Sequence, residues 1–358
     1  MKWRAYQWLV VLASIFIGTA GCQSNRNILK PKHVVSAHYE GNQKGYSTHE
    51  KIRNYLLSHH VNGSIAVVKQ NEIIFQEGIG FANRKQRITN QSSTAHPIAS
   101  ITKLIVATGI MQLQDQGKLT IQDSLSTYIP GFPNGKNIKL IHLLNHTSGI
   151  QTPRWHLSGK KPIEIVKKIK RKSIGFPAGT QWDYNDINYL LLGHIVEIVS
   201  GVPLHDYIKK HIFNKASMGH SGFITDEKAV FSKGYVKIGD QLLPAKQLNT
   251  DSLFGCGDIY STVHDLCLFD EALMSGKLVS NQSLKEMLTP GPKSTYGLGL
   301  YVSDGLVYSR GVVGGWESLH VYFKNKTAIA ILLNVRDKGI DIHQVSMDVY
   351  QMLNEKHL

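Results

Sequence analysis

Two residues at the start of an apolar segment have side chains that could carry out nucleophilic catalysis together. Ser100 and Lys103 stand three positions apart in "HPIASITKLIVATGIMQLQDQGKL", ahead of apolar residues with helical spacing. Residues three apart share one face of a helix, so the Lys103 ammonium can reach the Ser100 hydroxyl, and the helix N-terminus offers N–H groups to a developing oxyanion. The pattern predicts an activated serine, although an N-cap serine followed by a solvated lysine leaves the same pattern.

The Ser-x-x-Lys spacing is weak evidence alone, because this chain contains it twice. The second pair, Ser158 and Lys161, stands in the turn sequence "SGKKP" with Pro162 directly behind it. Proline is disfavoured inside a helix, so only the pair at Ser100 opens an apolar helix. Only that pair is predicted to act in catalysis.

A tyrosine on a loop is the second candidate for proton transfer. Tyr184 lies in "FPAGTQWDYNDINYLLLGHIVEIVSG", residues 176–201, where a loop containing Gly and Trp precedes an apolar helix. This placement lets the phenol point into a cleft. Taken alone, a tyrosine in such a loop is more often packed than catalytic.

The elements that must position these residues follow from periodicity. Residues 63–83 alternate around a polar turn, which predicts a β-hairpin, and residues 98–116 have helical spacing that ends at a glycine. Residues 138–211 are mostly helical, residues 296–335 are strands with tight turns, and residues 341–355 form an amphipathic helix. Strands at both ends with helices between them predict an α/β protein of the α+β type, with an antiparallel sheet and an inserted all-helical region.

The first residues predict export. Lys2 and Arg4 precede a short apolar run, and small residues then lead to Cys22 in "GTAGC". A membrane span needs roughly 20 apolar residues, and a cysteine after small residues is typical of bacterial lipoproteins; plain cleavage or an uncleaved anchor are the alternatives. We predict a signal peptide over residues 1–21, a tether over 22–47 and a catalytic domain over 48–358, lipid-anchored at Cys22.

The charge of the chain restricts its partners. The formal net charge is +14, but the lysines are scattered, and residues 167–172 form the only dense basic run. A nucleic-acid-binding protein would need a basic recognition element, so no nucleic acid is expected. Phospholipid headgroups and phosphate-rich wall polymers are the anions that an exported protein meets.

Together the segments resemble the serine penicillin-recognising family, in the branch of class C β-lactamases, D,D-peptidases and their esterase relatives. The resemblance runs from about Ile52 to Leu353. Its markers follow the family's order: "SITK" from Ser100, "LLNHTSGI" from Leu143, "FPAGTQWDYND" from Phe176, "GCGDIYSTVHDL" from Gly255, "YGLGL" from Tyr296 and "RGVVGGWES" from Arg310. The resemblance implies a five-stranded antiparallel sheet flanked by helices, with a helical region forming the other wall of the cleft.

The resemblance also implies the roles of the residues. Ser100 is the nucleophile that forms an acyl-enzyme, Lys103 and Tyr184 move its proton, and no metal or organic cofactor is required. The oxyanion would be held by the N–H groups of Ser100 and of the Gly-rich strand near Gly315, although this strand aligns in more than one register. The predicted substrate-binding positions are Trp182, Gly314, Trp316 and Glu317.

Two departures from the family pattern bear on the reaction. The second motif usually reads Tyr-x-Asn, whereas here Asp186 follows Tyr184 and Asn185. A carboxylate near Lys103 favours the ammonium and shifts the base role toward Tyr184, so Asp186 joins the predicted catalytic residues.

The third motif usually carries a Lys or His that binds a substrate carboxylate. When this motif is aligned with Val312, Val313 and Gly314, the cation is missing. The missing charge-assisted hydrogen bond is worth roughly 1.5–3 kcal/mol, which disfavours β-lactamase and carboxypeptidase activity.

These departures favour a substrate without a carboxylate. D-Alanyl esters on lipoteichoic or wall teichoic acid carry an ammonium group, with which the carboxylate of Asp186 or Glu317 could pair. The phosphate groups of the same polymer would be attracted to the basic surface of the protein. The expected function is a D-alanyl esterase on the outer face of the cytoplasmic membrane in a Gram-positive envelope. A carboxypeptidase or general esterase of the same fold, and an inert wall-binding module, are the alternatives.

Overall fold

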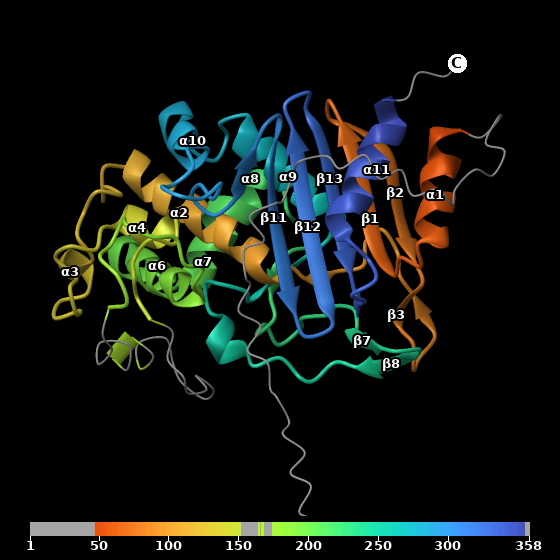
Figure 1. Ribbon diagram of the computed structural model, residues 1–358, viewed down its shortest axis with the longest axis horizontal. Coiled ribbons are helices and arrows are strands. Elements are labelled where there is room, and N and C mark those ends of the chain that lie inside the picture. Colours follow the sequence, from red (N-terminus) through yellow and green to blue (C-terminus); the bar gives the residue numbers. More distant parts are fainter. Residues whose placement is uncertain (1–46, 152–163, 165, 168–173, 355–358) are drawn as a thin grey trace, which may run out of the picture. The chain divides into compact units, whose positions relative to one another are not determined.

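The computed structural model describes residues 47–151, 164, 166–167 and 174–354. The predicted signal peptide, Cys22, nearly all of the tether and the second Ser-x-x-Lys pair lie outside these residues. Within the described part, six strands form an antiparallel sheet in the order β10-β11-β12-β13-β1-β2 (Figure 1). The strands of this sheet are β1 (Gly63–Lys69), β2 (Glu72–Ile79), β10 (Tyr301–Ser303), β11 (Leu306–Val313), β12 (Trp316–Phe323) and β13 (Thr327–Leu333). Five of them are long, as predicted, and the three-residue β10 adds a short edge.

The remaining elements surround this sheet. The helices are α1 (Thr48–Ser58), α2 (Thr102–Asp115), α3 (Leu125–Tyr128), α4 (Leu140–Leu144), α6 (Asp186–Ser200), α7 (Leu204–Ile208), α8 (Asn214–Ala216), α9 (Val263–Met274), α10 (Asn281–Met287) and α11 (Ile342–Asn354). Short helical turns are η1 (Ala99–Ile101), η2 (Lys209–Phe213) and η3 (Thr250–Leu253). The small sheets contain β3 (Phe81–Asn83), β4 (Ile88–Thr89), β5 (His96–Pro97), β6 (Gly222–Phe223), β7 (Tyr235–Ile238), β8 (Gln241–Pro244), β9 (Ile259–Ser261) and β14 (Val335–Arg336).

The sheet separates two hydrophobic cores. Successive side chains of a strand point to opposite faces, so β13 sends Ala330 to the face covered by α9 and Ile331 to the face covered by α1 and α11. The first core continues into α2 and α6, whereas the second lies between the sheet and α1 with α11 (Figure 1). The fold is therefore a mixed α/β fold with helices on both faces of an antiparallel sheet.

Strands from the two ends of the described chain pair at the centre of the sheet. β1 runs antiparallel to β13, with Ala66 opposite Ala330, and the hairpin of β1 and β2 turns at Gln70 and Asn71. The sequence prediction of a sheet closed by both ends of the catalytic region is confirmed. Since Ser100 and Tyr184 come from the segment between these strands, the sheet must close before the site can form.

Two structural features bring the chain to the site. Helix α2 is buried on all sides from Thr102 to Leu113, which fixes its N-terminal end inside the molecule. Strand β11 pairs with β10 only as far as Tyr308, so the last residues of β11 present an edge that β10 does not cover. The turn η1, which contains Ser100, lies against this part of β11.

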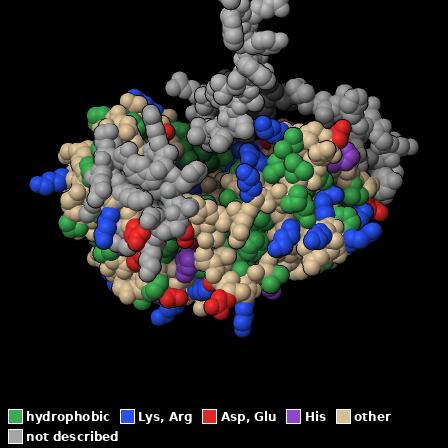
Figure 2. All heavy atoms as spheres, turned by 90° about the horizontal axis from the view of Figure 1, so that it is seen from below, with side chains coloured by type: hydrophobic (Ala, Val, Ile, Leu, Met, Phe, Trp, Pro, Cys, Tyr) green, Lys and Arg blue, Asp and Glu red, His purple; other side chains and the backbone are tan. Residues whose placement is uncertain are grey.

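The charged side chains at the surface are as scattered as the sequence indicates. Figure 2 shows lysine and arginine side chains scattered among hydrophobic and acidic ones on one face, without a continuous basic stripe. Within the described residues, no single helix is long and apolar enough to span a membrane. In the part of the chain that the structure describes, α6 together with the segment Leu204–Ala216, bent by 79°, is the one helix pair that passes the test by length and composition.

Candidate active site

The ammonium group of Lys103 is the centre of the predicted site. Its Nζ atom lies 2.9 Å from Ser100 Oγ, 2.8 Å from the Cys256 carbonyl oxygen and 2.8 Å from Asp186 Oδ1. An ammonium has three protons, and each of these three acceptors lies within hydrogen-bond distance of it. Burial of this fully enclosed side chain lowers the pKa of Lys103. The Asp186 carboxylate, with smaller effects from Tyr184 and Cys256, outweighs burial and raises the pKa above its usual value. Lys103 is therefore held as a cation beside the Ser100 hydroxyl.

The backbone around Ser100 presents its hydroxyl to Lys103. Ser100 lies in the turn η1, one step before α2, and Ala99 ahead of it has a positive φ of 47°. An alanine in this left-handed region costs of order 1–3 kcal/mol, and such strain gathers at functional sites. Neither η1 nor α2 begins with a side-chain cap bond, so the alternative of a capping serine does not hold. The partly exposed Ser100 remains open to solvent on one side.

Tyr184 lies beside the same two groups, Ser100 and Lys103. Its phenol lies near enough to Lys103 and Ser100 for hydrogen bonding to both groups to lower its pKa, and Lys103 Nζ lies 5.0 Å from the centre of the Tyr184 ring. Burial raises the pKa of Tyr184, while the Lys103 cation and these hydrogen bonds oppose that increase. The structure thus brings Ser100, Lys103, Tyr184 and Asp186 together, in the grouping that the sequence predicted.

Asp186 reaches Lys103 from the first turn of α6. Asn185 caps this helix by accepting a hydrogen bond from the Ile187 N–H at 3.0 Å, and its amide also donates to the Ile150 carbonyl at 2.6 Å. The cap fixes where α6 begins and therefore where Asp186 projects. The Asp186 side chain is 61% exposed although its partner Lys103 is fully buried, so one carboxylate links the enclosed cation to solvent.

His146 is a site residue that the sequence reading did not single out. Its buried ring lies 4.2 Å from the Tyr184 ring, centre to centre, in the "NHTSG" part of a loop that was read only as a family marker. The Asn185 backbone N–H donates to His146 Nδ1 at 3.2 Å, so Nδ1 is an acceptor and the proton resides on Nε2. Burial, then the charge of Lys103, lowers the pKa of His146, which keeps the ring neutral. His146 therefore holds Tyr184 in place without adding charge.

Trp182 lies beside Tyr184 but contacts other aromatic rings. The ring centres of Trp182 and Tyr184 are 6.4 Å apart, and Tyr296 lies 6.5 Å from Trp182 and 4.9 Å from His146. The buried Trp182 Nε1 has no hydrogen-bond partner among the described residues. These rings form an aromatic wall that fixes the phenol of Tyr184, so the position predicted for Trp182 is near the site.

The strand that abuts Ser100 is β11 at Gly311. A Cβ atom at Gly311 would lie 2.2 Å from the Ile98 carbonyl oxygen and 2.8 Å from the Ser100 backbone nitrogen. Real Cβ atoms do not approach backbone atoms so closely, so this position requires glycine. The Ser100 N–H and the edge of β11 at Gly311 are therefore the backbone groups that lie together beside the nucleophile.

The prediction for Gly315 is wrong in its placement. A Cβ atom at Gly315 would lie 2.3 Å from the Tyr235 backbone nitrogen, because Gly315 packs against β7 and not against Ser100. Gly314, with φ of 53°, and Gly315 form the two-residue turn between β11 and β12. The hairpin turn, with Val313 opposite Trp316, sets the register and moves both glycines away from the nucleophile.

The predicted substrate contacts of Trp316 and Glu317 are also corrected. Trp316 is 6% exposed, and its Nε1 donates to Ser232 Oγ at 3.0 Å. The buried Glu317 accepts hydrogen bonds from Arg310 Nε at 2.8 Å and Nη2 at 2.5 Å. Strand alternation places Glu317 on the same face as Leu319, which packs toward α11, so neither side chain is available beside Ser100.

The third motif consists of Ser309, Arg310 and Gly311, three positions earlier than predicted. Gly311 abuts Ser100, and Ser309, two residues before it, shares its face of the strand. The hydroxyl of the buried Ser309 donates to the Gly299 carbonyl at 3.2 Å. As predicted, an uncharged residue stands where the motif usually carries a cation. That residue is Ser309, whereas the predicted alignment had placed Val312 there.

Known proteins resemble this chain over most of its length. The model of the family described as Beta-lactamase matches residues 50–342. PbpX of Bacillus subtilis (strain 168), named as a penicillin-binding protein, is 39% identical over 318 residues, covering 87% of this chain and 80% of PbpX. A teichoic acid D-alanine hydrolase of Staphylococcus aureus (strain MRSA252) is 29% identical over 295 residues, covering 80% of this chain and 74% of the hydrolase. The crystal structure of FmtA from Staphylococcus aureus superposes with a TM-score of 0.78 at 25% identity, covering 87% of this chain and 92% of FmtA.

Proposed function

The chain belongs to the Beta-lactamase family of serine hydrolases, which includes penicillin-binding proteins, and from this premise we propose that it removes D-alanyl esters from teichoic acids. The family assignment makes it a serine hydrolase of the β-lactamase fold. The substrate is the proposed part. The relative named teichoic acid D-alanine hydrolase supports this substrate, as do the charges around Ser100.

The observation that carries the proposal is the partly exposed Asp186 carboxylate, 2.8 Å from Lys103 Nζ. A D-alanyl ester carries an ammonium one carbon from its reactive carbonyl, so a substrate at Ser100 brings this cation close to Asp186. A carboxylate with solvent-exposed lone pairs can accept its hydrogen bonds. The uncharged Ser309 suits a substrate without a carboxylate, because this position offers no cation that a substrate carboxylate would neutralise.

The proposed reaction passes through an acyl-enzyme. Ser100 Oγ attacks the ester carbonyl carbon while its proton moves to the phenolate form of Tyr184, and the Ser100 N–H with the edge of β11 stabilises the oxyanion. Collapse breaks the bond to the polyol oxygen, which takes the proton from Tyr184. Water then attacks the D-alanyl ester on Ser100, giving its proton to Tyr184, which returns it to Ser100 Oγ as D-alanine leaves. Lys103 stays an ammonium throughout and stabilises the phenolate.

A D,D-carboxypeptidase is the second candidate, because PbpX, the 39% identical relative, is named as a penicillin-binding protein. Its peptide substrate ends in a carboxylate, which Ser309 cannot pair as a cation would. We therefore rank this activity below the esterase.

The proposed setting is outside the cytoplasmic membrane, with the protein held there by a lipid on Cys22. The predicted signal peptide over residues 1–21 supports this setting, as does the formal charge of +14, which suits an anionic polymer as partner. The cell-wall polymer in the name of the Staphylococcus aureus relative points the same way.

The test is release of D-alanine from purified lipoteichoic acid. We expect release by the wild type and a decrease of at least about 10³-fold for Ser100→Ala, since removal of a nucleophile leaves only residual catalysis. Ser93→Ala, at an exposed loop serine, is the matched control and should keep full activity. Equal release by wild type and Ser100→Ala would refute the assignment of Ser100. Release from D-Ala-D-Ala peptides instead of lipoteichoic acid would favour the carboxypeptidase.

A further inference from the structure

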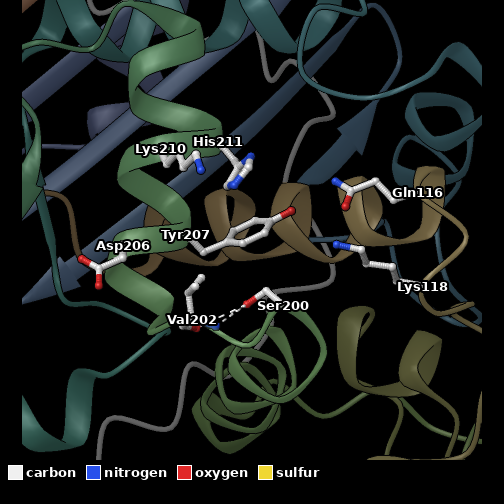
Figure 3. A pocket seen from close by; sticks show the side chains of 8 residues that line it. All are labelled: Gln116, Lys118, Ser200, Val202, Asp206, Tyr207, Lys210 and His211. Atoms are coloured by element: carbon white, nitrogen blue, oxygen red, sulfur yellow. Dashed lines mark hydrogen bonds between the residues drawn. The ribbon is translucent and has the colours of Figure 1, made fainter.

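A pocket lies at the other end of α2, the helix that begins at the active site. It has a volume of about 260 Å³ and is lined by residues that follow α2, by the end of α6 and by α7 with η2 (Figure 3). Helix α2 has 14 residues, so its two ends are about 20 Å apart at 1.5 Å per residue. A small ester bound at Ser100 cannot reach this pocket, whereas a polymer is long enough to do so.

The charged side chains at this pocket are mainly cationic. Lys118 comes from the loop after α2, and Lys210 and His211 come from η2. Neither Lys118 nor Lys210 has an ion-pair partner among the described residues, unlike the adjacent Lys209, which pairs with Asp226 at 3.2 Å. The carboxylate of Asp206 points away from the other labelled groups in Figure 3.

A buried hydroxyl faces the same space. Tyr207 is 2% exposed, and the Gln116 side chain donates toward its hydroxyl oxygen, which works against the effect of burial on the pKa of Tyr207. Among the described residues, no acceptor lies within hydrogen-bond distance of the Tyr207 hydroxyl. In Figure 3 this hydroxyl points toward the side where Gln116 and Lys118 lie, and the His211 ring stacks on the Tyr207 ring with centres 4.5 Å apart. Buried polar groups nearly always have a partner, so an acceptor atom of a ligand would complete this site.

We propose that this pocket binds a phosphate group of a polyol-phosphate chain, with Lys118 and Lys210 as the cationic groups, the Tyr207 hydroxyl as a donor and His211 as a ring that becomes protonated when the anion binds. The polymer as the source of the phosphate rests on the proposed function, whereas binding of the anion does not. A phosphate accepts several charge-assisted hydrogen bonds, which suits two ammonium groups and a phenol better than a single carboxylate.

His211 provides a direct readout of an anion in the pocket. Burial lowers the pKa of His211, and the positive charges of Lys210, Lys215 and Lys118 lower it further. A bound phosphate adds negative charge beside the ring and favours the imidazolium, so the pKa of His211 must rise on binding. The charged groups around the ring are these three lysines and Asp206.

The first experiment titrates the full chain with inorganic phosphate and with glycerol phosphate, and follows the His211 imidazole by NMR. We expect millimolar binding, because the carbonyl ends of α2 and α6 also face this region and weaken the binding of an anion. We also expect the pKa of His211 to rise when the anion binds. The double variant Lys118→Gln with Lys210→Gln should bind at least about tenfold more weakly. Lys324→Gln, at an exposed turn, is the matched control and should bind as the wild type does. Absence of binding by the wild type, or equal binding by the double variant, would overturn the proposal.

The second experiment separates this pocket from the reaction at Ser100. The double variant should have a several-fold higher KM for lipoteichoic acid and an unchanged kcat for a small D-alanyl ester. Ser100→Ala should bind phosphate like the wild type, so loss of the pocket and loss of the proposed reaction give different results. If phosphatidylglycerol vesicles displace glycerol phosphate and lipoteichoic acid does not, the polymer is the wrong source of the phosphate.

Discussion

Lys103 Nζ lies 2.8 Å from Asp186 Oδ1, although the Lys103 side chain is fully buried and the Asp186 side chain is 61% exposed. A buried cation needs a partner, and this one is paired with the most solvent-accessible residue of the site. A substrate ammonium that approaches Asp186 therefore competes with Lys103 for the same carboxylate. The state of charge beside Ser100 can thus respond to the substrate.

Replacing Asp186 should move the pH dependence of hydrolysis. The Asp186 carboxylate raises the pKa of both Lys103 and Tyr184, so Asp186→Asn lowers both. Because the proposed reaction needs the phenolate of Tyr184, activity rises with pH, and this rising limb should move to lower pH in the variant. The measurement is kcat/KM for D-alanyl ester hydrolysis against pH.

Asp183→Asn is the matched control for this experiment, since Asp183 lies on the loop directly before α6 but is not among the groups that shift the pKa of Lys103. Its pH profile should match that of the wild type. An unchanged profile for Asp186→Asn would show that Asp186 has no part in proton transfer. A raised KM for the ester alone would leave Asp186 as a substrate-binding residue only.

Gly311→Ala should disrupt the site at the contact between β11 and η1. The new Cβ atom would lie 2.2 Å from the Ile98 carbonyl and 2.8 Å from the Ser100 nitrogen, so η1 must move away from the strand. We expect kcat to fall by about 10²–10³-fold, as when one oxyanion donor is lost. Gly219→Ala, where nothing lies within 4 Å of the added carbon, should retain activity. Full activity of Gly311→Ala would exclude this strand edge from the oxyanion site.

Ser309→His tests whether the missing cation determines the choice of substrate. An imidazolium at this position could pair a carboxylate, and a charge-assisted hydrogen bond of about 1.5 kcal/mol corresponds to roughly tenfold faster acylation by a penicillin. The measurement is the rate of labelling by a fluorescent penicillin, with hydrolysis of a D-alanyl ester as the control that should not increase. Equal labelling of variant and wild type, with the thermal midpoint retained, would show that Ser309 does not set this preference.

His96 should make the fold sensitive to acid. It is fully buried between Ser232 Oγ, 2.8 Å from Nδ1, and Ser64 Oγ, 3.1 Å from Nε2, and burial lowers the pKa of His96 to about 3. The unfolded chain binds a proton on this ring below about pH 6.5, whereas the native state does not, so the free energy of unfolding falls as the pH decreases from there toward 3. The slope from this residue is at most about 1.4 kcal/mol per pH unit.

Urea unfolding of His96→Gln should therefore show a lower stability at pH 7 and a weaker loss of stability between pH 6.5 and 4. His60→Asn, at an exposed position, should keep the slope of the wild type. A slope for His96→Gln as steep as that of the wild type would assign the acid sensitivity to other groups, such as His343, whose pKa is lowered to about 4 mainly by burial.

The sequence by itself determined the groups whose geometry is local. Ser100 and Lys103 are three residues apart at the start of a buried helix, and Tyr184 and Asp186 flank the cap of α6, so short-range spacing predicted each pair. The antiparallel sheet with inserted helices followed from periodicity. An Asp186 carboxylate beside Lys103 was also predicted, and the ion pair at 2.8 Å agrees with it.

Only the tertiary structure decided which residues of the Gly-rich strand face Ser100. Side chains of a strand alternate between faces, so a shift in register changes every contact, and this chain offers three glycines within the five residues 311–315. The Gly314–Gly315 turn fixes the register, places Gly311 against Ser100 and turns Glu317 toward Arg310 on the other face. The position of His146 against Tyr184 and the pocket at the far end of α2 likewise depend on packing between segments distant in sequence, which no local spacing encodes.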